Sequence, residues 1–142
     1  MIIADILRNK GAAVLTIAPE ASAAELAAVL AENRIGAVVV VEHDRPIGIV
    51  SERDVVRGLN SEGAGVLDAS VADLMTTELF TCEPADSVDR ISVAMTERRI
   101  RHVPVLDGGE LAGIVSIGDV VAARIRDLET ARGQLESYIT QG

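Results

Sequence analysis

The chain has 142 residues, of which 49% are hydrophobic, and a formal net charge of −9 at pH 7. A chain this acidic lacks the clustered basic face that nucleic-acid binding needs, so we expect no nucleic-acid partner. A single cysteine excludes an intramolecular disulfide and fits a reducing compartment. With one Phe, one Tyr and no Trp, the core must be built from aliphatic side chains.

The N-terminal segment lacks the features of a targeting signal. Residues 1–8 lack the charged start, the apolar stretch and the cleavage site of a secretory signal peptide. The longest uncharged apolar run, 35–41, has about seven residues, which is far too short to span a membrane. We therefore expect a soluble, cytoplasmic protein with no membrane partner.

The dominant feature of the sequence is an internal repeat. Residues 14–56 align with residues 79–121 at a constant offset of 65 positions and without a gap. Of the 43 aligned pairs, 15 are identical. Chance does not produce such an alignment, so the sequence predicts two copies of one structural unit.

The first half of each copy predicts a short extended piece followed by a helix. The extended pieces, 14–17 and 79–82, each run into a proline, which disfavours helix just before it. Ser22 or Ser87 then stands where a helix N-cap belongs. Apolar residues follow at spacings of three and four, so we expect one face of each helix to be buried.

The second half of each copy predicts a β-hairpin and a second helix. Two β-rich runs are linked by a turn in both copies. These runs are 37–42 and 47–50 in the first copy, and 102–106 and 111–115 in the second. A helix then begins after Ser51 or Ser116.

Short similar segments precede the two copies. Residues 3–7 are Ile-Ala-Asp-Ile-Leu and residues 71–75 are Val-Ala-Asp-Leu-Met. We expect each copy to carry a short lead-in helix, with a flexible glycine-containing stretch over 58–65 between the copies.

One unit of about 45 residues rarely builds a sufficient core alone, whereas two units packed face to face do. We therefore predict an α/β fold of duplicated β-α-β-β-α units packed with pseudo-two-fold symmetry, plus a long C-terminal helix. The first repeat with its lead-in helix and linker is assigned to 1–65. The second repeat is assigned to 66–125, and the helical extension to 126–142.

The C-terminal segment has no proline from 119 to 139. Its apolar residues recur at heptad spacing, with Arg132 interrupting the seam: Val121, Ile125, Leu128, Leu135 and Ile139. Two interpretations remain open. The helix packs on its own module, or it extends past the module and pairs with a second subunit, which would make the protein a homodimer.

The motif Gly-Ile-Val-Ser-x-x-Asp ends the hairpin of both copies, at 48–54 and 113–119. One interpretation is a capping box, in which serine and the acid satisfy free amides at a helix start. The other is a ligand site. A helix N-terminus favours anions, and a hydroxyl beside a carboxylate suits a sugar phosphate.

The residues before the second strand differ between the copies. The first copy has Gly36 and Ala37, which are small enough for a flat ring to approach the backbone. The second has Arg101 and His102 at the same positions, which are either two cations for a phosphate or a solvated strand edge.

No catalytic constellation is present in the sequence. There is no Ser/His/Asp order, no metal-spaced His/Cys set and no glycine-rich phosphate loop. Cys82 aligns with Ile17 of the first copy, so we expect it to be a buried small hydrophobe. We therefore expect neither an enzyme, nor a catalytic cofactor, nor a metal site.

Taken together, the repeat, the Gly-Ile-Val-Ser-x-x-Asp endings and the Arg-Ile-Arg-His-Val-Pro-Val segment resemble a tandem pair of cystathionine β-synthase (CBS) domains, a Bateman module. The resemblance covers roughly 2–125. It implies a stand-alone signal-transduction module that binds an adenosyl ligand (AMP, ADP, ATP, NAD or S-adenosylmethionine) in clefts between the repeats. Binding would change the conformation read by an effector protein that the sequence does not identify.

The resemblance also implies roles for individual residues. Asp54 and Asp119 would hold ribose hydroxyls, with Ser51 and Ser116 beside the ribose or phosphate. The base pocket would be lined by Thr16, Thr81 and backbone around Ala37 and Val103, while Arg53, Arg101 and His102 would face phosphates. The complete predicted ligand-binding set is Thr16, Ala18, Gly36, Ala37, Val38, Ser51, Arg53, Asp54, Met75, Thr81, Arg101, His102, Val103, Pro104, Ser116 and Asp119.

The chain departs from the family pattern at several of these positions. Arg101-His102 reverses a frequent His-Arg order, and Gly118 replaces Arg53 in the second copy. We therefore expect the two sites to differ in affinity or in preferred ligand. The alternative function is a ligand-free structural or interaction module that dimerises through its C-terminal helix.

Overall fold

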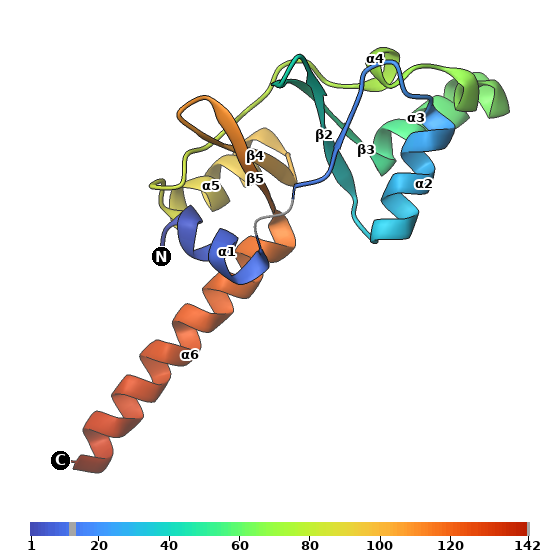
Figure 1. The fold of residues 1–142 in the computed structure, drawn as a ribbon. Coiled ribbons are helices and arrows are strands. Elements are labelled where there is room, and N and C mark those ends of the chain that lie inside the picture. Colours follow the sequence, from blue (N-terminus) through green and yellow to red (C-terminus); the bar gives the residue numbers. More distant parts are fainter. Residues whose placement is uncertain (12–13, 142) are drawn as a thin grey trace. The chain divides into compact units, whose positions relative to one another are not determined.

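The computed structural model describes residues 1–11 and 14–141 (Figure 1). Its elements in chain order are α1 (Ile3–Lys10), β1 (Thr16–Ile17), α2 (Ala23–Asn33), β2 (Ala37–Glu42), β3 (Arg45–Ser51), α3 (Glu52–Glu62), the 3₁₀ helix η1 (Gly63–Asp68), α4 (Val71–Leu74), α5 (Val88–Arg98), β4 (His102–Asp107), β5 (Glu110–Ser116) and α6 (Ile117–Gln141). The predicted α/β class, with a duplicated unit and a long C-terminal helix, is confirmed.

Contacts divide the chain into two compact units. The first-copy unit comprises Ala13–Phe80 with Gly109–Leu111, and the second-copy unit comprises Met1–Ala12, Thr81–Gly108 and Ala112–Gly142. Helix α1 therefore groups with the second copy and α4 with the first. This grouping differs from the sequential division at 65/66, because each lead-in helix packs on the copy that does not follow it in the chain.

Two equivalent glycines explain how each lead-in segment packs. A Cβ added at Gly48 would lie 2.7 Å from the Sδ of Met75, and one added at Gly113 would lie 2.6 Å from Cδ2 of Leu7. Leu7 and Met75 are the last residues of the two similar segments noted in the sequence. Each strand therefore needs a glycine at the position where the lead-in segment lies against it.

The first-copy sheet has the order β1-β2-β3, with β1 parallel and β3 antiparallel to β2. The central strand β2 is buried from Ala37 to Val40, as expected for an apolar run between two neighbours. The core of this unit consists of Ile17, Leu26, Leu30, Val38, Val40, Val50 and Val71. Helix α2 contributes Leu26 and Leu30, and it begins at the predicted N-cap Ser22, whose Oγ accepts from the N–H of Glu25 at 3.1 Å.

The hairpins of both copies turn through two residues with positive φ. These are His43 and Asp44 at 51° and 62°, and Gly108 and Gly109 at 61° and 87°. Positive φ at both central positions is the signature of a type I′ turn, whose twist matches that of the flanking strands. Strand β3 therefore begins at Arg45, two residues earlier than predicted.

The extended piece 79–82 lies beside the two-stranded sheet β4-β5, where Cys82 forms a parallel bridge with Val105 as β1 does with β2. One local prediction is wrong. The stretch 58–65 is helical rather than flexible, since it is divided between α3 and η1. Gly58 is buried in this stretch, and a Cβ added to it would lie 2.5 Å from Cγ2 of Val66. The absence of a side chain at this position therefore allows close packing.

Helix α6 extends beyond the unit that it starts from. Its first turns bury Val120 and Ala123. Every residue from 124 to 140 is exposed, and Figure 1 shows the helix running away from α1, α5 and the β4-β5 hairpin. The predicted extension is confirmed, while pairing with a second subunit stays a prediction. Over 1–11 and 14–141, no helix combines the length and apolar character needed to cross a membrane.

Candidate functional site

Ser51 ends β3 and forms the N-cap of α3. Asp54 Oδ2 accepts hydrogen bonds from the N–H of Ser51 at 2.8 Å and from its Oγ at 3.1 Å. In return, the N–H of Asp54 donates to Ser51 Oγ at 3.4 Å. The capping-box interpretation is therefore correct at this site, and any ligand role of Asp54 must be compatible with it.

Strand register brings the predicted small residues to this cap. Ala37 pairs with Ser51 across β2 and β3, and the N–H of Glu52 donates to the carbonyl of Gly36 at 3.0 Å. Arg53 follows on the first turn of α3 and is exposed. Four of the predicted ligand-binding residues thus lie together with Asp54 at one end of the hairpin.

The second copy repeats this geometry. The N–H of Ser116 donates to Asp119 Oδ2 at 2.9 Å, and the N–H of Asp119 donates to Ser116 Oγ at 3.1 Å. The N–H of Ile117 donates to the carbonyl of Arg101 at 2.8 Å, which corresponds to the bond from Glu52 to Gly36. His102 follows as the first residue of β4. The structure therefore places Arg101 and His102 beside the second cap.

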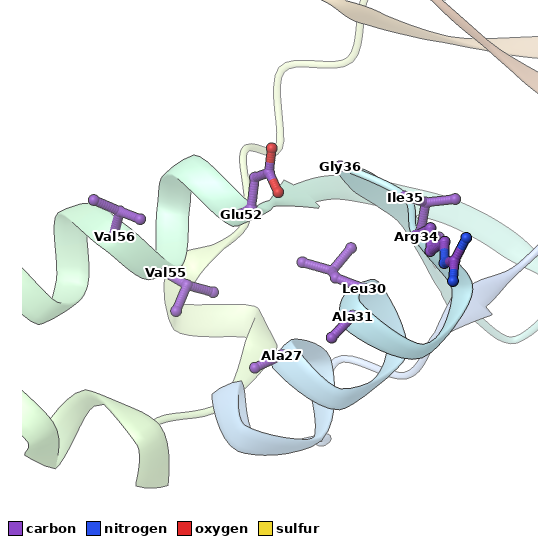
Figure 2. Close-up of a pocket in the computed structure, with 9 residues that line it drawn as sticks. All are labelled: Ala27, Leu30, Ala31, Arg34, Ile35, Gly36, Glu52, Val55 and Val56. Carbon is purple, nitrogen blue, oxygen red and sulfur yellow. The ribbon is translucent and has the colours of Figure 1, made fainter.

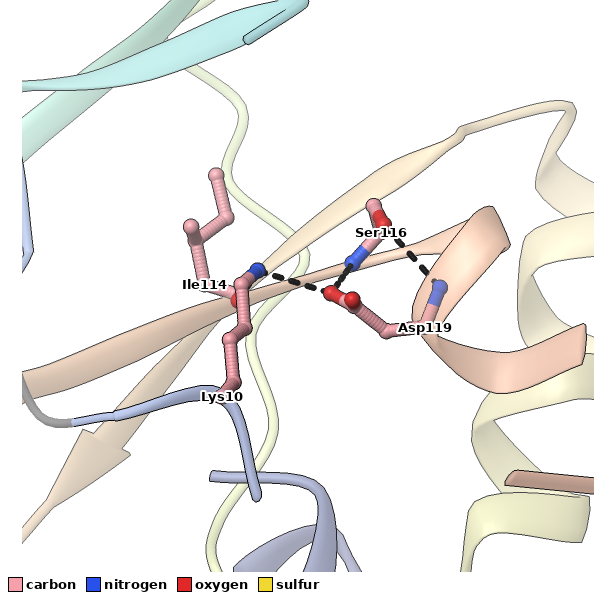
Figure 3. A network of polar contacts seen from close by, with 4 residues as sticks. All are labelled: Lys10, Ile114, Ser116 and Asp119. Carbon is pink, nitrogen blue, oxygen red and sulfur yellow. Dashed lines mark hydrogen bonds and ion pairs between the residues drawn. The ribbon is translucent and has the colours of Figure 1, made fainter. Parts of the chain in front are cut away.

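Lys10 makes the second cap different from the first (Figure 3). This last residue of α1 donates from Nζ to Asp119 Oδ2 at 2.7 Å and to the carbonyl of Ile114 at 2.8 Å. Sequence reasoning did not select Lys10. Nothing in the sequence shows that α1 packs on the second copy, so the lysine had no visible partner.

The contacts with Lys10 and Ser116 lower the pKa of Asp119. Burial by itself would raise the pKa of this carboxyl, but hydrogen bonds from Lys10 and Ser116, together with the lysine charge, hold the pKa below its usual 3.8. Asp119 is therefore a carboxylate at neutral pH, already paired with an ammonium group.

The N-termini of α3 and α6 have fewer free amides for binding an anion than the sequence predicted. Of the first three amides of α3, that of Glu52 bonds to Gly36 and that of Asp54 bonds to Ser51. Within the described residues, the N–H of Arg53 is therefore the only one of these three amides that remains for a ligand. In α6, the corresponding amide is that of Gly118. A phosphate would therefore depend mainly on the basic side chains nearby.

The remaining predicted residues lie farther along the strands. Thr16 pairs with Val39 in β1, and Ala18 follows that strand. Met75 packs on Gly48 and on the first-copy core, whereas Thr81 precedes the bridge at Cys82. The other predicted residues are buried strand residues of which only the backbone could meet a ligand: Val38, Val103 and Pro104.

A cavity of about 490 Å³ lies between α2 and α3 of the first copy (Figure 2). Its lining is mostly aliphatic, and Arg34 and Glu52 are its charged members. Gly36 is the one residue of the predicted ligand-binding set among those that line it. This apolar groove is therefore distinct in composition from the Ser51–Asp54 cap.

Cys82 has the properties of a core residue. The side chain is 3% exposed. Burial, aided by the charge of Asp86 and opposed by that of Arg90, raises the pKa of its thiol to about 12. The thiol is protonated at neutral pH, which agrees with the predicted role as a buried small hydrophobe. Across the described ranges, no three His, Cys, Asp or Glu residues are grouped so as to hold a metal ion.

The repeated unit and its paired caps define a tandem module of two small α/β domains. The sequence matches the CBS domain family over residues 3–61 and 71–126. The chain therefore belongs to the CBS domain family and carries two copies of the domain, as the resemblance predicted.

Known proteins support this assignment. The mitochondrial CBS domain-containing protein CBSX3 of Arabidopsis thaliana is 33% identical, with 99% of this chain and 72% of that protein aligned. A CBS-domain containing protein from Agrobacterium tumefaciens has a crystal structure that matches with a TM-score of 0.85 at 42% identity, covering 87% of this chain and 99% of that one. The CBS domain pair of protein MJ0100, solved with 5′-methylthioadenosine and S-adenosyl-L-methionine, matches in fold with a TM-score of 0.80 at 23% identity, covering 89% and 98%.

Proposed function

We propose that this chain is a regulatory module that binds an adenosyl ligand (AMP, ADP, ATP or NAD) at its Ser-x-x-Asp caps and signals to an effector protein. The observation that carries the proposal is the repetition of one cap in both copies, each beside the start of a hairpin strand. The MJ0100 pair supports the ligand class, because both of its ligands contain an adenosyl group. We expect the protein to act by binding rather than by catalysis.

Asp54 is the proposed ribose contact of the first copy. Its Oδ2 is held by the N–H and the Oγ of Ser51. A fixed carboxylate can accept from both hydroxyls of a ribose. The small side chains at 36 and 37 would let a base approach the neighbouring backbone.

The phosphate contacts would differ between the copies. Arg53 is the basic residue at the first cap, whereas the second cap has Gly118 at that position and Arg101 with His102 at the strand start. We propose that the first site holds its phosphate from the helix side and the second from the strand side. Binding would shift a conformational equilibrium only by the difference in ligand affinity between its states.

The test is calorimetric titration of the protein with adenosine, AMP, ATP and NAD. We expect binding of at least one of these, weakened about tenfold or more by Asp54→Ala, because hydrogen bonds to a charged group contribute about 1.5–3 kcal/mol each. Ser22→Ala is the matched control, since it removes an N-cap from α2 of the same copy and leaves Asp54 intact. Equal weakening by both variants would assign Asp54 a purely structural role, and silence with all four ligands would refute the adenosyl proposal.

A second proposed function is self-association through α6. Its exposed seam places Val121, Leu128 and Leu135 at d positions and Ile125, Arg132 and Ile139 at a positions of a heptad. In a parallel pair the g position Arg124 faces the e position Glu129 of the second copy, so charge favours this orientation. Arg124 also pairs with Asp89 within the chain at 2.7 Å, which limits how much the interchain pair adds. The occupant we propose is therefore a second copy of this chain, aligned in parallel.

A further inference from the structure

We propose that Lys10 is an internal competitor for Asp119, so that the first copy binds an adenosyl ligand more tightly than the second. The inference rests on the proposed function, because it concerns the carboxylates assigned to the ribose. It goes further by assigning a specificity-determining role to a residue outside both repeats.

The contact is well defined on both sides. Figure 3 shows the Lys10 side chain directed at the point where β5 meets α6, between the carbonyl of Ile114 and the carboxylate of Asp119. The side chain of Lys10 is 37% exposed and that of Asp119 is 23% exposed. The pair is thus partly sheltered from water, which strengthens it compared with an exposed surface pair.

The first copy satisfies the equivalent carbonyl in another way. Ile49 corresponds to Ile114, and its carbonyl accepts from the N–H of Thr76 at 2.9 Å. The chain after α4 is extended there and forms an antiparallel bridge between Ile49 and Thr76. The chain of α1 instead remains helical as far as Lys10, whose ammonium replaces the backbone donor and also reaches the carboxylate.

The sequence rules out an equivalent lysine in the first copy. When the lead-in segments 3–7 and 71–75 are aligned and extended, Lys10 corresponds to Glu78. An acidic residue there cannot neutralise Asp54.

This difference affects a ribose directly. Ribose hydroxyls must donate to a carboxylate, and Asp119 Oδ2 is held by the ammonium of Lys10, whereas Asp54 Oδ2 accepts only from the neutral N–H and Oγ of Ser51 among the hydrogen bonds of its cap. Lys10 belongs to the same chain, so it competes at a high effective concentration. When Lys10 is displaced, the carbonyl of Ile114 also loses its ammonium donor. The apparent affinity of the second site is therefore multiplied by the fraction of molecules in which Lys10 is displaced.

The experiment isolates the second site with Asp54→Ala and then adds Lys10→Met, which keeps an unbranched apolar stem without the charge. Titration with AMP and with adenosine should show that the double variant binds about two- to fivefold more tightly than Asp54→Ala alone, the range that competition from a partly exposed ion pair allows. Arg8→Met is the matched control. It removes another cation of α1 that pairs with Asp5 on the helix surface, so it should leave AMP binding unchanged.

Two results would overturn the inference while the proposed function stands. If the wild type binds AMP and Lys10→Met leaves the second site unchanged, Lys10 does not compete. If Lys10→Met weakens AMP but not adenosine, Lys10 contacts the phosphate instead. Absence of binding in the wild type and in every folded variant would refute the proposed function itself, and a thermal melt of each variant shows that it is folded.

Discussion

The Ser-x-x-Asp caps of the two copies have the same internal geometry and different surroundings. Each has a serine that ends a strand, an aspartate that bonds back to it, and a first helical amide tied to the residue before the other strand. Within residues 1–11 and 14–141, the second cap has a lysine on its carboxylate and the first has none, and the second continues into a helix of 25 residues instead of 11. The two copies thus share the hydrogen bonds of the cap, while the segments packed around each cap make the two sites different.

We expect the largest effect from a substitution on α6, which extends far beyond the length of its counterpart α3. Leu128→Asp places a charge at a d position of the proposed pair, where burial of an unpaired charge is unfavourable. We expect the dimer to become a monomer at micromolar concentration, as measured by light scattering after gel filtration.

The control for this change is Thr130→Asp, which adds the same charge at an f position away from the seam. It should leave the dimer intact. A wild-type chain that is itself monomeric, or a Leu128→Asp chain that stays dimeric, would contradict the proposed role of α6.

An intermediate effect is expected at the glycines against which the lead-in segments pack. A Cβ at Gly48 meets both Met75 and the backbone carbonyl of Thr76, at 2.9 Å, whereas one at Gly113 meets only the flexible end of Leu7. Gly48→Ala should therefore lower the free energy of unfolding by about 1–3 kcal/mol, as overpacking does, and Gly113→Ala by less. Urea denaturation measures both, and a greater loss for Gly113→Ala would show that Leu7 yields to an added Cβ less readily than Met75 and Thr76 do.

The smallest effect is the pH dependence of the pair between Lys10 and Asp119. The folded pKa of Asp119 lies below its unfolded value, so the pair stabilises the protein above the unfolded pKa of about 3.9 and this stabilisation is lost as pH falls through the folded pKa. Lys10→Met should lower the free energy of unfolding at pH 7 by less than about 1 kcal/mol, because the lysine is partly exposed.

The measurement is the difference between wild type and Lys10→Met in urea denaturation at several pH values, since the other acidic residues titrate in both proteins. The two curves should converge below about pH 4 and in high salt. A difference that grows on acidification would show that the contact does not stabilise the carboxylate form.

The sequence alone determined the repeat, the helices and hairpins of each copy, and the position of its Ser-x-x-Asp caps. Local rules were sufficient because Ser22, Ser51 and Ser116 act on amides within three residues, and the apolar spacing of α2 and α5 shows which face is buried. The family resemblance was visible for the same reason, since its motifs coincide with these local devices.

Only the tertiary structure decided which lead-in helix packs on which copy, and therefore that Lys10 meets Asp119 across 109 positions of the chain. It also decided that Gly58 packs tightly on Val66 instead of loosening a linker. Both depend on contacts between segments whose separate patterns are ordinary. A short amphipathic helix with a terminal lysine reads the same in sequence whichever sheet it covers, because its periodicity records that one face is buried and not what buries it.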